Sequence, residues 1–194
     1  MMDCNTVWIT SSPRTLSMWT NNVTRKILNS KNYNVLPLEQ PREDKEWIDL
    51  YEKQAFTDSS KTNKYVIKLH GYVKTTLPKS KFISIIRNPY DICASYFEFT
   101  KSDLESAIKV AKNHINIIKH YRTSPADKLL ILRYEEIELN PVKTVQQISS
   151  FLDIDLSNQI AEEISNQFTR SRVKQIIDNC NQKLKSKIDK KETI

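Results

Sequence analysis

The chain contains almost no glycine: Gly71 is the only one among its 194 residues. Glycine-rich loops wrap closely around nucleotide phosphates because glycine has no side chain and tolerates positive φ. A single glycine therefore excludes both the GxGxxG dinucleotide loop and the GxxxxGK[ST] phosphate loop.

Cysteines and long apolar runs are also scarce. Cys4, Cys93 and Cys180 are too few and too scattered for a disulfide framework, and none belongs to a CxxC metal-ligand pair. No run of about 18 apolar residues occurs, so no transmembrane helix is predicted. The N-terminus carries Asp3 where a signal peptide carries positive charge. These features predict a protein of the reducing cytoplasm.

The composition is that of a folded domain, with 39% hydrophobic and 27% charged residues. The length suits one domain, so we predict a single domain over residues 1–194. The net charge of +7 indicates an anionic partner without identifying it. Residues 183–194 are rich in lysine, and we interpret them as a solvated basic tail.

Short apolar runs alternate with helical patterns along the chain. Strands are predicted at residues 7–10, 34–36, 65–70, 82–87 and 129–132. Helices are predicted at residues 16–29, 44–56, 89–99, 102–121, 141–152 and from 157 onward. This alternation predicts an α/β fold: a three-layer sandwich with a mostly parallel central sheet of about five strands, as in P-loop NTPases. Such sheets bind ligands beyond the carboxyl ends of their strands.

The end of the first strand is a candidate anion site. Residues 10–19 read TSSPRTLSMW, which predicts a strand, a short polar turn and a helix. This junction presents backbone N–H groups and the positive end of a helix dipole at one point. Arg14, Thr15 and Ser17 add donors there. An ordinary capped turn has the same pattern, so this segment by itself leaves both interpretations open.

The third predicted strand ends in a lysine–histidine pair. Lys68 and His70 are two residues apart, so their side chains point to the same face of the strand. A nearby ammonium disfavours imidazolium and keeps His70 neutral and able to accept a proton. His114 and His120 lie in a polar helical stretch without such neighbours, and we expect both at the surface.

The fourth predicted strand ends in Arg87, a permanent charge whose burial without an anion is costly. Asn88 and Pro89 are typical of a helix N-cap and first helical position. Ser95 follows two turns into that helix. A surface salt bridge of Arg87 is the alternative to an anion site.

In this order the segments resemble the PAPS-dependent sulfotransferases, which move a sulfuryl group from 3′-phosphoadenosine 5′-phosphosulfate (PAPS) to an acceptor and release PAP. PRTLSMW at 13–19 resembles the 5′-phosphosulfate loop, and KLH at 68–70 resembles the Lys-Thr-His strand end. IRNPYDICASY at 86–96 resembles the 3′-phosphate motif. RYEE at 133–136, followed by NP at 140–141 and FL at 151–152, is similar to the Tyr-Glu-Asp, Asp-Pro and Phe-Leu run. The ordered set, within residues 7–156, is specific.

The resemblance implies donor-binding roles. Arg14 and the backbone N–H groups of Thr15, Leu16, Ser17 and Met18 would hold the 5′-phosphosulfate. Trp19 would stack on adenine, and Tyr134 would contact the edge of the base. Arg87 and Ser95 would bind the 3′-phosphate.

The resemblance also implies a reaction without a metal. His70 would act as the general base on an acceptor hydroxyl (or amine), while Lys68 and Arg14 would stabilise charge during in-line transfer. The acceptor would be a small molecule, a carbohydrate or a peptide, and the sequence leaves it and the oligomeric state open.

Two departures from the family pattern matter. Leu16 replaces the loop glycine, so the backbone there should avoid positive φ or form a slightly different turn. The family's C-terminal Arg-Lys-Gly-x-x-Gly segment is missing. We expect Arg170 or Arg172 to substitute for it, with Thr169 as a neighbouring donor.

Three alternatives remain open. A P-loop kinase has the same strand–loop–helix start, but it needs a Gly-Lys loop end and an acidic residue for Mg²⁺. A basic nucleic-acid-binding protein fits the charge, although no specific nucleic acid is indicated. A sulfotransferase-like protein that binds without turnover fits the motifs, and the intact His70 argues against it.

Overall fold

The computed structural model describes residues 4–41, 43–169, 171–172 and 175. Its strands form one sheet in the order β2-β3-β1-β4-β5, and every pair is parallel. The predicted five-stranded parallel sheet is thereby confirmed. The strands are β1 (Thr6–Thr10), β2 (Asn34–Leu36), β3 (Asn63–Leu69), β4 (Ser80–Ile86) and β5 (Leu129–Arg133).

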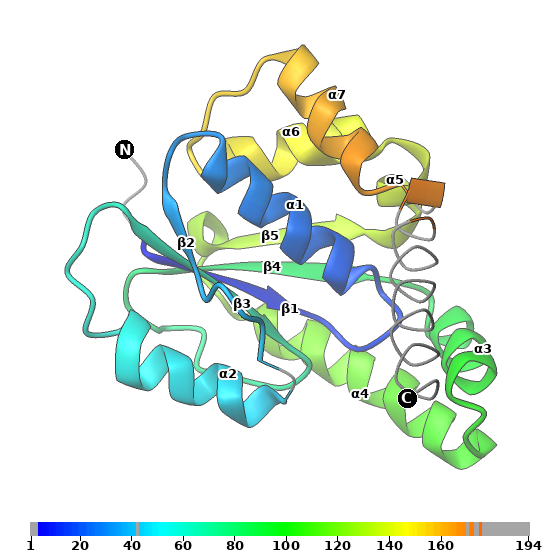
Figure 1. The fold of residues 1–194 in the computed structure, drawn as a ribbon. Coiled ribbons are helices and arrows are strands. Elements are labelled where there is room, and N and C mark those ends of the chain that lie inside the picture. Colours follow the sequence, from blue (N-terminus) through cyan, green and yellow to red (C-terminus); the bar gives the residue numbers. More distant parts are fainter. Residues whose placement is uncertain (1–3, 42, 170, 173–174, 176–194) are drawn as a thin grey trace, which may run out of the picture.

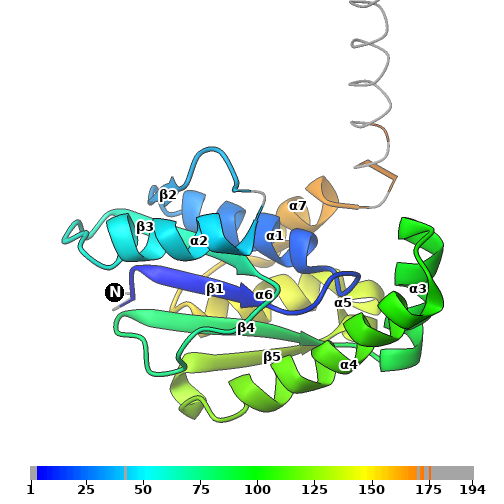
Figure 2. The ribbon, with the colours of Figure 1, turned by 90° about the horizontal axis from the view of Figure 1, so that it is seen from below.

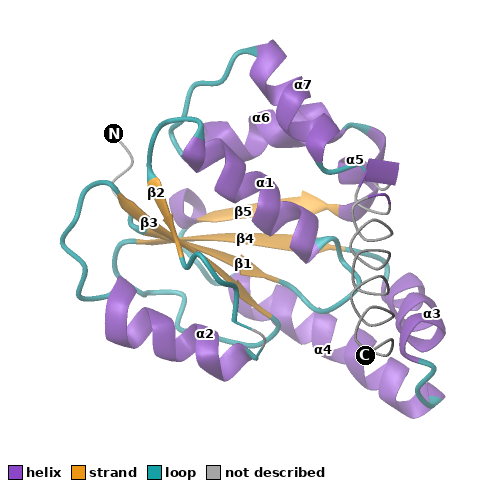
Figure 3. Cartoon of the chain, in the orientation of Figure 1, coloured by secondary structure: helices purple, strands orange, loops and turns teal. Residues whose placement is uncertain are grey.

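Helices cover both faces of the sheet, which gives the three predicted layers (Figure 3). The single helix predicted over 44–56 is divided into an α-helix and a π-helical segment, and the short helix α5 was not predicted. None of the described helices is both long and apolar enough to cross a membrane. The helices are α1 (Ser17–Asn29), α2 (Asp44–Leu50), the π-helix Tyr51–Ala55, α3 (Pro89–Thr100), α4 (Leu104–Tyr121), the 3-10 helix Ala126–Lys128, α5 (Tyr134–Leu139), α6 (Pro141–Phe151) and α7 (Asn158–Gln167).

The core consists of two apolar layers, one on each face of the sheet. Alternate residues of β1 serve opposite layers: Val7 and Ile9 pack into one, and Trp8 packs into the other. The first layer includes buried residues of α1, α6 and α7, and the second includes Trp47 of α2 and Tyr121 of α4. Figure 1 shows α1, α6 and α7 on one side of the strands and α2 and α4 on the other.

The strand order reverses at β1. The chain runs from β1 through α1 to β2 at one edge of the sheet, and after β3 it passes β1 to reach β4 on the other side. Figure 2 shows β1, β4 and β5 ending toward the same edge, near α3 and the start of α1. Since open parallel sheets bind ligands where the strand order reverses, this edge is where a site is expected.

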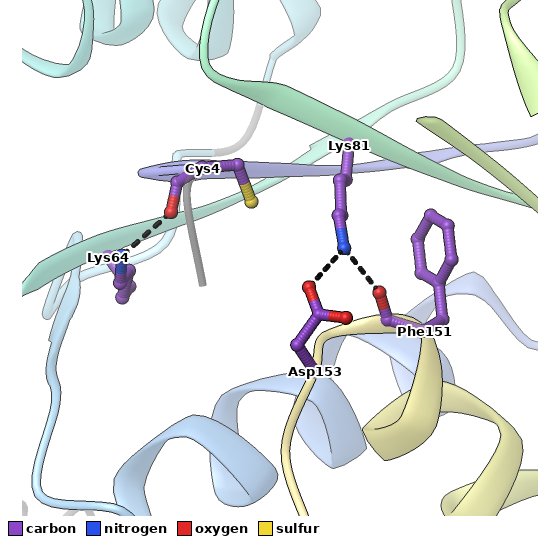
Figure 4. A network of polar contacts seen from close by, with 5 residues as sticks. All are labelled: Cys4, Lys64, Lys81, Phe151 and Asp153. Carbon is purple, nitrogen blue, oxygen red and sulfur yellow. Dashed lines mark hydrogen bonds and ion pairs between the residues drawn. The ribbon is translucent and has the colours of Figure 1, made fainter. Parts of the chain in front are cut away.

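Lysines fix the opposite, amino-terminal ends of the strands. The Lys81 ammonium donates to the Phe151 carbonyl (2.6 Å) and to Asp153 (2.8 Å), and Lys64 donates to the Cys4 carbonyl (2.7 Å) (Figure 4). These bonds join the starts of β3 and β4 to neighbouring segments. They hold the sheet together at a distance from the carboxyl edge.

Candidate functional site

The loop between β1 and α1 is closed by its own hydroxyl groups. The Thr15 Oγ1 donates to the Ser12 carbonyl (2.7 Å) and lies 2.7 Å from the Ser11 hydroxyl. Because the Thr15 proton is engaged with the carbonyl, Ser11 is the donor in the second bond. The Thr15 side chain is fully buried, so it shapes the loop from inside.

The same loop contains two residues in the left-handed region. Arg14 has φ 66° and Leu16, the N-cap of α1, has φ 64°. Of the two expectations for Leu16, the one that its backbone avoids positive φ is therefore wrong. The leucine keeps the conformation that glycine adopts without strain, at a cost of about 1–2 kcal/mol. Contacts of Leu16 with the core partly offset that strain.

A matched pair of variants measures this strain. Leu16→Gly and Leu16→Ala both remove the leucine side chain, but only glycine relieves the positive φ. The relief of strain in Leu16→Gly exceeds the extra backbone entropy that glycine loses on folding. We therefore expect a net stability difference, measured by urea unfolding, of roughly 0.5–1 kcal/mol in favour of Leu16→Gly over Leu16→Ala. An alanine variant as stable as the glycine variant would contradict a left-handed Leu16.

The first turn of α1 presents unused backbone donors. Its first helical bond runs from the Thr20 N–H to the Leu16 carbonyl (2.9 Å), so the N–H groups of Ser17, Met18 and Trp19 have no partner within the helix. No acidic residue lies in this turn. The first turn of α1 itself therefore adds no carboxylate that would compete for the positive end of the helix.

A cavity of about 620 Å³ lies in front of this turn. Most residues that the sequence assigned to the donor line it, while the side chains of Lys68 and His70 lie outside its lining. Three lining residues were not predicted: Asp91, Ala94 and Glu98 of α3. They face the loop because they lie on the same side of the helix as Ser95. The predicted residues that line the cavity are Arg14, Leu16, Ser17, Met18, Trp19, Arg87, Ser95 and Tyr134.

Two arginines meet at this cavity. The Arg87 Nη1 donates to the Arg14 carbonyl (2.5 Å), and its guanidinium stacks on the Tyr134 ring, 3.9 Å from the centroid. The Arg14 Nε donates to the Ser95 hydroxyl (3.1 Å), and its guanidinium lies 4.2 Å from the Phe99 centroid. The sequence had placed Arg14 at the 5′-phosphosulfate; in this structure its Nε contacts the serine assigned to the 3′-phosphate.

Neither guanidinium is neutralised by a carboxylate within the described residues. The Nε of Arg87 is buried and has no hydrogen-bond partner there. Burying a charged donor without a partner is costly, and an anion in the adjacent cavity removes that cost. The pair is therefore suited to binding a phosphate or sulfate group.

Lys68 and His70 lie on one face, as predicted. The His70 Nδ1 lies against the Ser11 carbonyl, which can only accept, so Nδ1 carries the proton. The Nε2 is then the basic nitrogen, and it accepts from the Lys68 ammonium at 3.1 Å. Burial, and secondarily the Lys68 charge, lower the pKa of His70. Burial also lowers the pKa of Lys68, and Asp44 opposes that shift.

Asp44 and Gly71 support this histidine, and no sequence pattern assigned either residue to the site. The His70 backbone N–H donates to the Asp44 carboxylate, 3.0 Å from Oδ1 and 3.2 Å from Oδ2. A Cβ at Gly71 would lie 3.2 Å from the same Oδ2. The only glycine of the chain thus allows a carboxylate from the start of α2 to approach the strand end.

The structure describes only part of the C-terminal segment that was predicted to complete the donor site. Thr169 lines a second cavity of about 220 Å³ together with Leu16, Trp19 and Phe168. Arg172 is exposed, and its backbone N–H donates to the Thr169 hydroxyl (3.4 Å). Arg170 and residues 183–194 lie outside the described residues. Phe168, beside Trp19, was not predicted.

The expectation that His114 and His120 lie at the surface is wrong. His114 is 1% exposed, and His120 is half-buried with its Nε2 2.7 Å from the Val73 carbonyl. The buried residues of α4 explain the error: Ala107, Ala111, His114, Ile118 and Tyr121 recur at spacings of three and four. His114 therefore lies on the core-facing side of the helix.

Fold and site together define an α/β protein with a cavity at the carboxyl edge of a parallel sheet whose two arginines suit an anionic ligand. The model of the sulfotransferase domain family matches residues 5–193, so the chain belongs to that family. The predicted family is confirmed, and it favours sulfuryl transfer over the kinase and nucleic-acid alternatives. A search of curated proteins found no match.

Solved sulfotransferase structures share the fold. A mouse sulfotransferase complexed with PAP is 20% identical with a TM-score of 0.64, over 88% of this chain and 66% of that one. A retinol dehydratase in complex with androsterone and inactive cofactor PAP is 15% identical with a TM-score of 0.62, over 87% and 65%. A sulfotransferase from Alicyclobacillus acidocaldarius is 14% identical with a TM-score of 0.51, over 90% and 96%. The chain thus spans about two thirds of the first two.

Proposed function

We propose that this chain transfers a sulfuryl group from PAPS to an acceptor hydroxyl or amine and releases PAP. The observation that carries the proposal is the pair of arginines beside the first turn of α1. Arg87 has a buried, unpaired Nε, and Arg14 reaches Ser95 across the same cavity. A ligand with one anionic group on each side of an adenosine fits this arrangement.

The loop and α1 bind the 5′ end of the donor. The N–H groups of residues 15–18 and the helix dipole hold the phosphosulfate. Trp19 stacks on adenine and Tyr134 contacts its edge, with Phe168 and Thr169 close to Trp19. Arg87 and Ser95 bind the 3′-phosphate, and Arg14 lies between the two anionic groups. Arg170 or Arg172 closes the cage in place of the missing family segment.

His70 is the general base. Its Nε2 accepts the proton of the acceptor hydroxyl as the acceptor oxygen attacks sulfur in line. A new S–O bond forms, and the bond from sulfur to the bridging oxygen of the 5′-phosphate breaks, so its electrons leave with PAP. In this structure the Lys68 ammonium donates a hydrogen bond to the His70 Nε2. Its ammonium must turn to the sulfuryl oxygens, where it offsets developing charge together with Arg14.

The acceptor belongs to a broad class: a small molecule, a carbohydrate or a peptide that carries a hydroxyl. The retinol dehydratase complex contains androsterone, an example of a small-molecule ligand in a related fold.

A reducing cytoplasm fits the described cysteines, Cys4 and Cys93, which are both free thiols.

Ligand-dependent melting tests the donor assignment. We expect PAP to raise the melting temperature clearly more than ADP or AMP, equally with and without Mg²⁺. The 3′-phosphate adds charge-assisted hydrogen bonds, each contributing roughly 1.5–3 kcal/mol. Tighter binding to the folded state shifts melting upward.

The melting assay and two further measurements separate the alternatives. Equal stabilisation by ATP and PAP, or a strict need for Mg²⁺, would indicate a kinase. Salt-sensitive binding of bulk RNA or DNA without a preference for PAP would indicate a nucleic-acid-binding protein. Transfer of labelled sulfuryl from PAPS across a panel of phenols, sugars and tyrosyl peptides then separates turnover from mere binding.

A further inference from the structure

His114 joins the two segments that the donor site requires. It projects from the buried face of α4, and its Nδ1 lies 3.0 Å from the Ser12 hydroxyl in the loop after β1. On the other side of the ring, its Nε2 lies 3.3 Å from the backbone nitrogen of Arg87 at the end of β4. One imidazole from a third element thus contacts both strand ends.

The bonding fixes the tautomer of the ring. A backbone N–H can only donate, so the Nε2 that faces Arg87 carries the lone pair. The proton is therefore on Nδ1 and is donated to the Ser12 hydroxyl. Burial lowers the pKa of His114 to about 4, so the ring stays neutral at neutral pH with both bonds intact. Neither a leucine nor a phenylalanine at this position could make these two bonds.

The β1–β4 ladder ends at Thr10 and Ser84, so beyond it side-chain bonds connect the two segments. The Arg87 Nη1 bonds the Arg14 carbonyl, and further back the Ser84 hydroxyl bonds the Thr10 carbonyl. His114 instead holds the backbone at Arg87, from which the guanidinium extends. The backbone position sets where the guanidinium meets a ligand, and the Ser12 contact sets where the loop begins.

We propose that His114 is a positioning residue that fixes the phosphosulfate loop relative to Arg87 and thereby sets the affinity for the donor. This inference rests on the proposed PAPS site. It predicts that changes at His114 alter PAP binding and the KM for PAPS but leave the KM for the acceptor nearly unchanged. Any loss of fold stability in these variants is a separate effect.

The test compares His114→Leu, His114→Gln and Ser12→Ala with the parent protein by calorimetric titration with PAP and by donor and acceptor kinetics. His114→Leu should raise the PAP Kd and the PAPS KM at least tenfold, with the acceptor KM within twofold. His114→Gln keeps one donor and one acceptor and should lie within about threefold of the parent. His120→Gln, a half-buried histidine on the same helix, should leave the PAP Kd within twofold.

Three results would overturn the inference or its basis. A lower melting temperature of His114→Leu with an unchanged PAP Kd would make the residue merely structural. If His114→Leu does not fold, Ser12→Ala decides, because it removes the acceptor of the Nδ1 proton and leaves His114 in place. Ser12→Ala should raise the PAP Kd at least threefold, and a smaller rise would overturn the inference. A parent protein that does not bind PAP would instead refute the proposed function itself.

Discussion

We expect replacement of His70 with alanine to lower kcat for the proposed sulfuryl transfer by about 10²–10⁴-fold, the usual contribution of a general base. The PAP Kd stays within about twofold, because the His70 side chain lies outside the lining of the donor cavity. The loss follows from the assigned tautomer, in which only Nε2 can accept the acceptor proton. Single-turnover kinetics with labelled PAPS measure the chemical step, and calorimetry measures PAP binding.

The pH dependence provides the control. Burial and Lys68 lower the pKa of His70, so kcat stays level at neutral pH and falls only in acid, as pH drops through that lowered pKa below 6.5. Lys68→Met removes a positive neighbour, which raises the pKa of His70 and moves the acid limb to higher pH. A His70→Ala variant with near-parental kcat, or with an unchanged acid limb, would place the base on another residue.

We expect replacement of Arg87 with alanine to weaken PAP binding by about 100-fold and ADP binding by no more than about threefold. The guanidinium is held over Tyr134 and carries a buried, unpaired Nε, so an anion beside it gains strong charge-assisted bonds. Loss of about 3 kcal/mol corresponds to about two decades in Kd. Calorimetric titration with PAP and ADP measures the selectivity directly, because only PAP carries the 3′-phosphate.

Two variants control for charge alone. Arg133→Ala removes an exposed arginine from the end of the neighbouring strand β5, and it should change the PAP Kd by less than threefold. Arg87→Lys keeps the positive charge but loses the planar fork, so its PAP Kd should lie between those of the parent and Arg87→Ala. Equal losses for PAP and ADP in Arg87→Ala would show that Arg87 does not recognise the 3′-phosphate.

The sequence by itself determined the fold and most of the donor cavity. Apolar runs and helical periodicity depend on neighbours a few residues away, so the strands and most helices could be predicted. Arg14, Arg87 and Tyr134 could be placed together because they follow predicted strands, and in a parallel sheet those strand ends meet at one edge. Trp19 and Ser95 lie further along the following helices, and only the resemblance to the sulfotransferases assigned them. Lys68 and His70 needed only the two-residue repeat of a strand.

Only the tertiary structure decided which distant groups support these residues. Asp44 bonds His70 from 26 positions away, and His114 bonds Ser12 from 102 positions away. No local pattern encodes such pairs, because they depend on how α2 and α4 pack against the sheet. The left-handed Leu16 was mispredicted for the same reason: local sterics disfavour positive φ in leucine, but the path from β1 into α1 and contacts with the core impose it. Local preferences therefore placed the strand ends, and long-range packing determined the geometry between them.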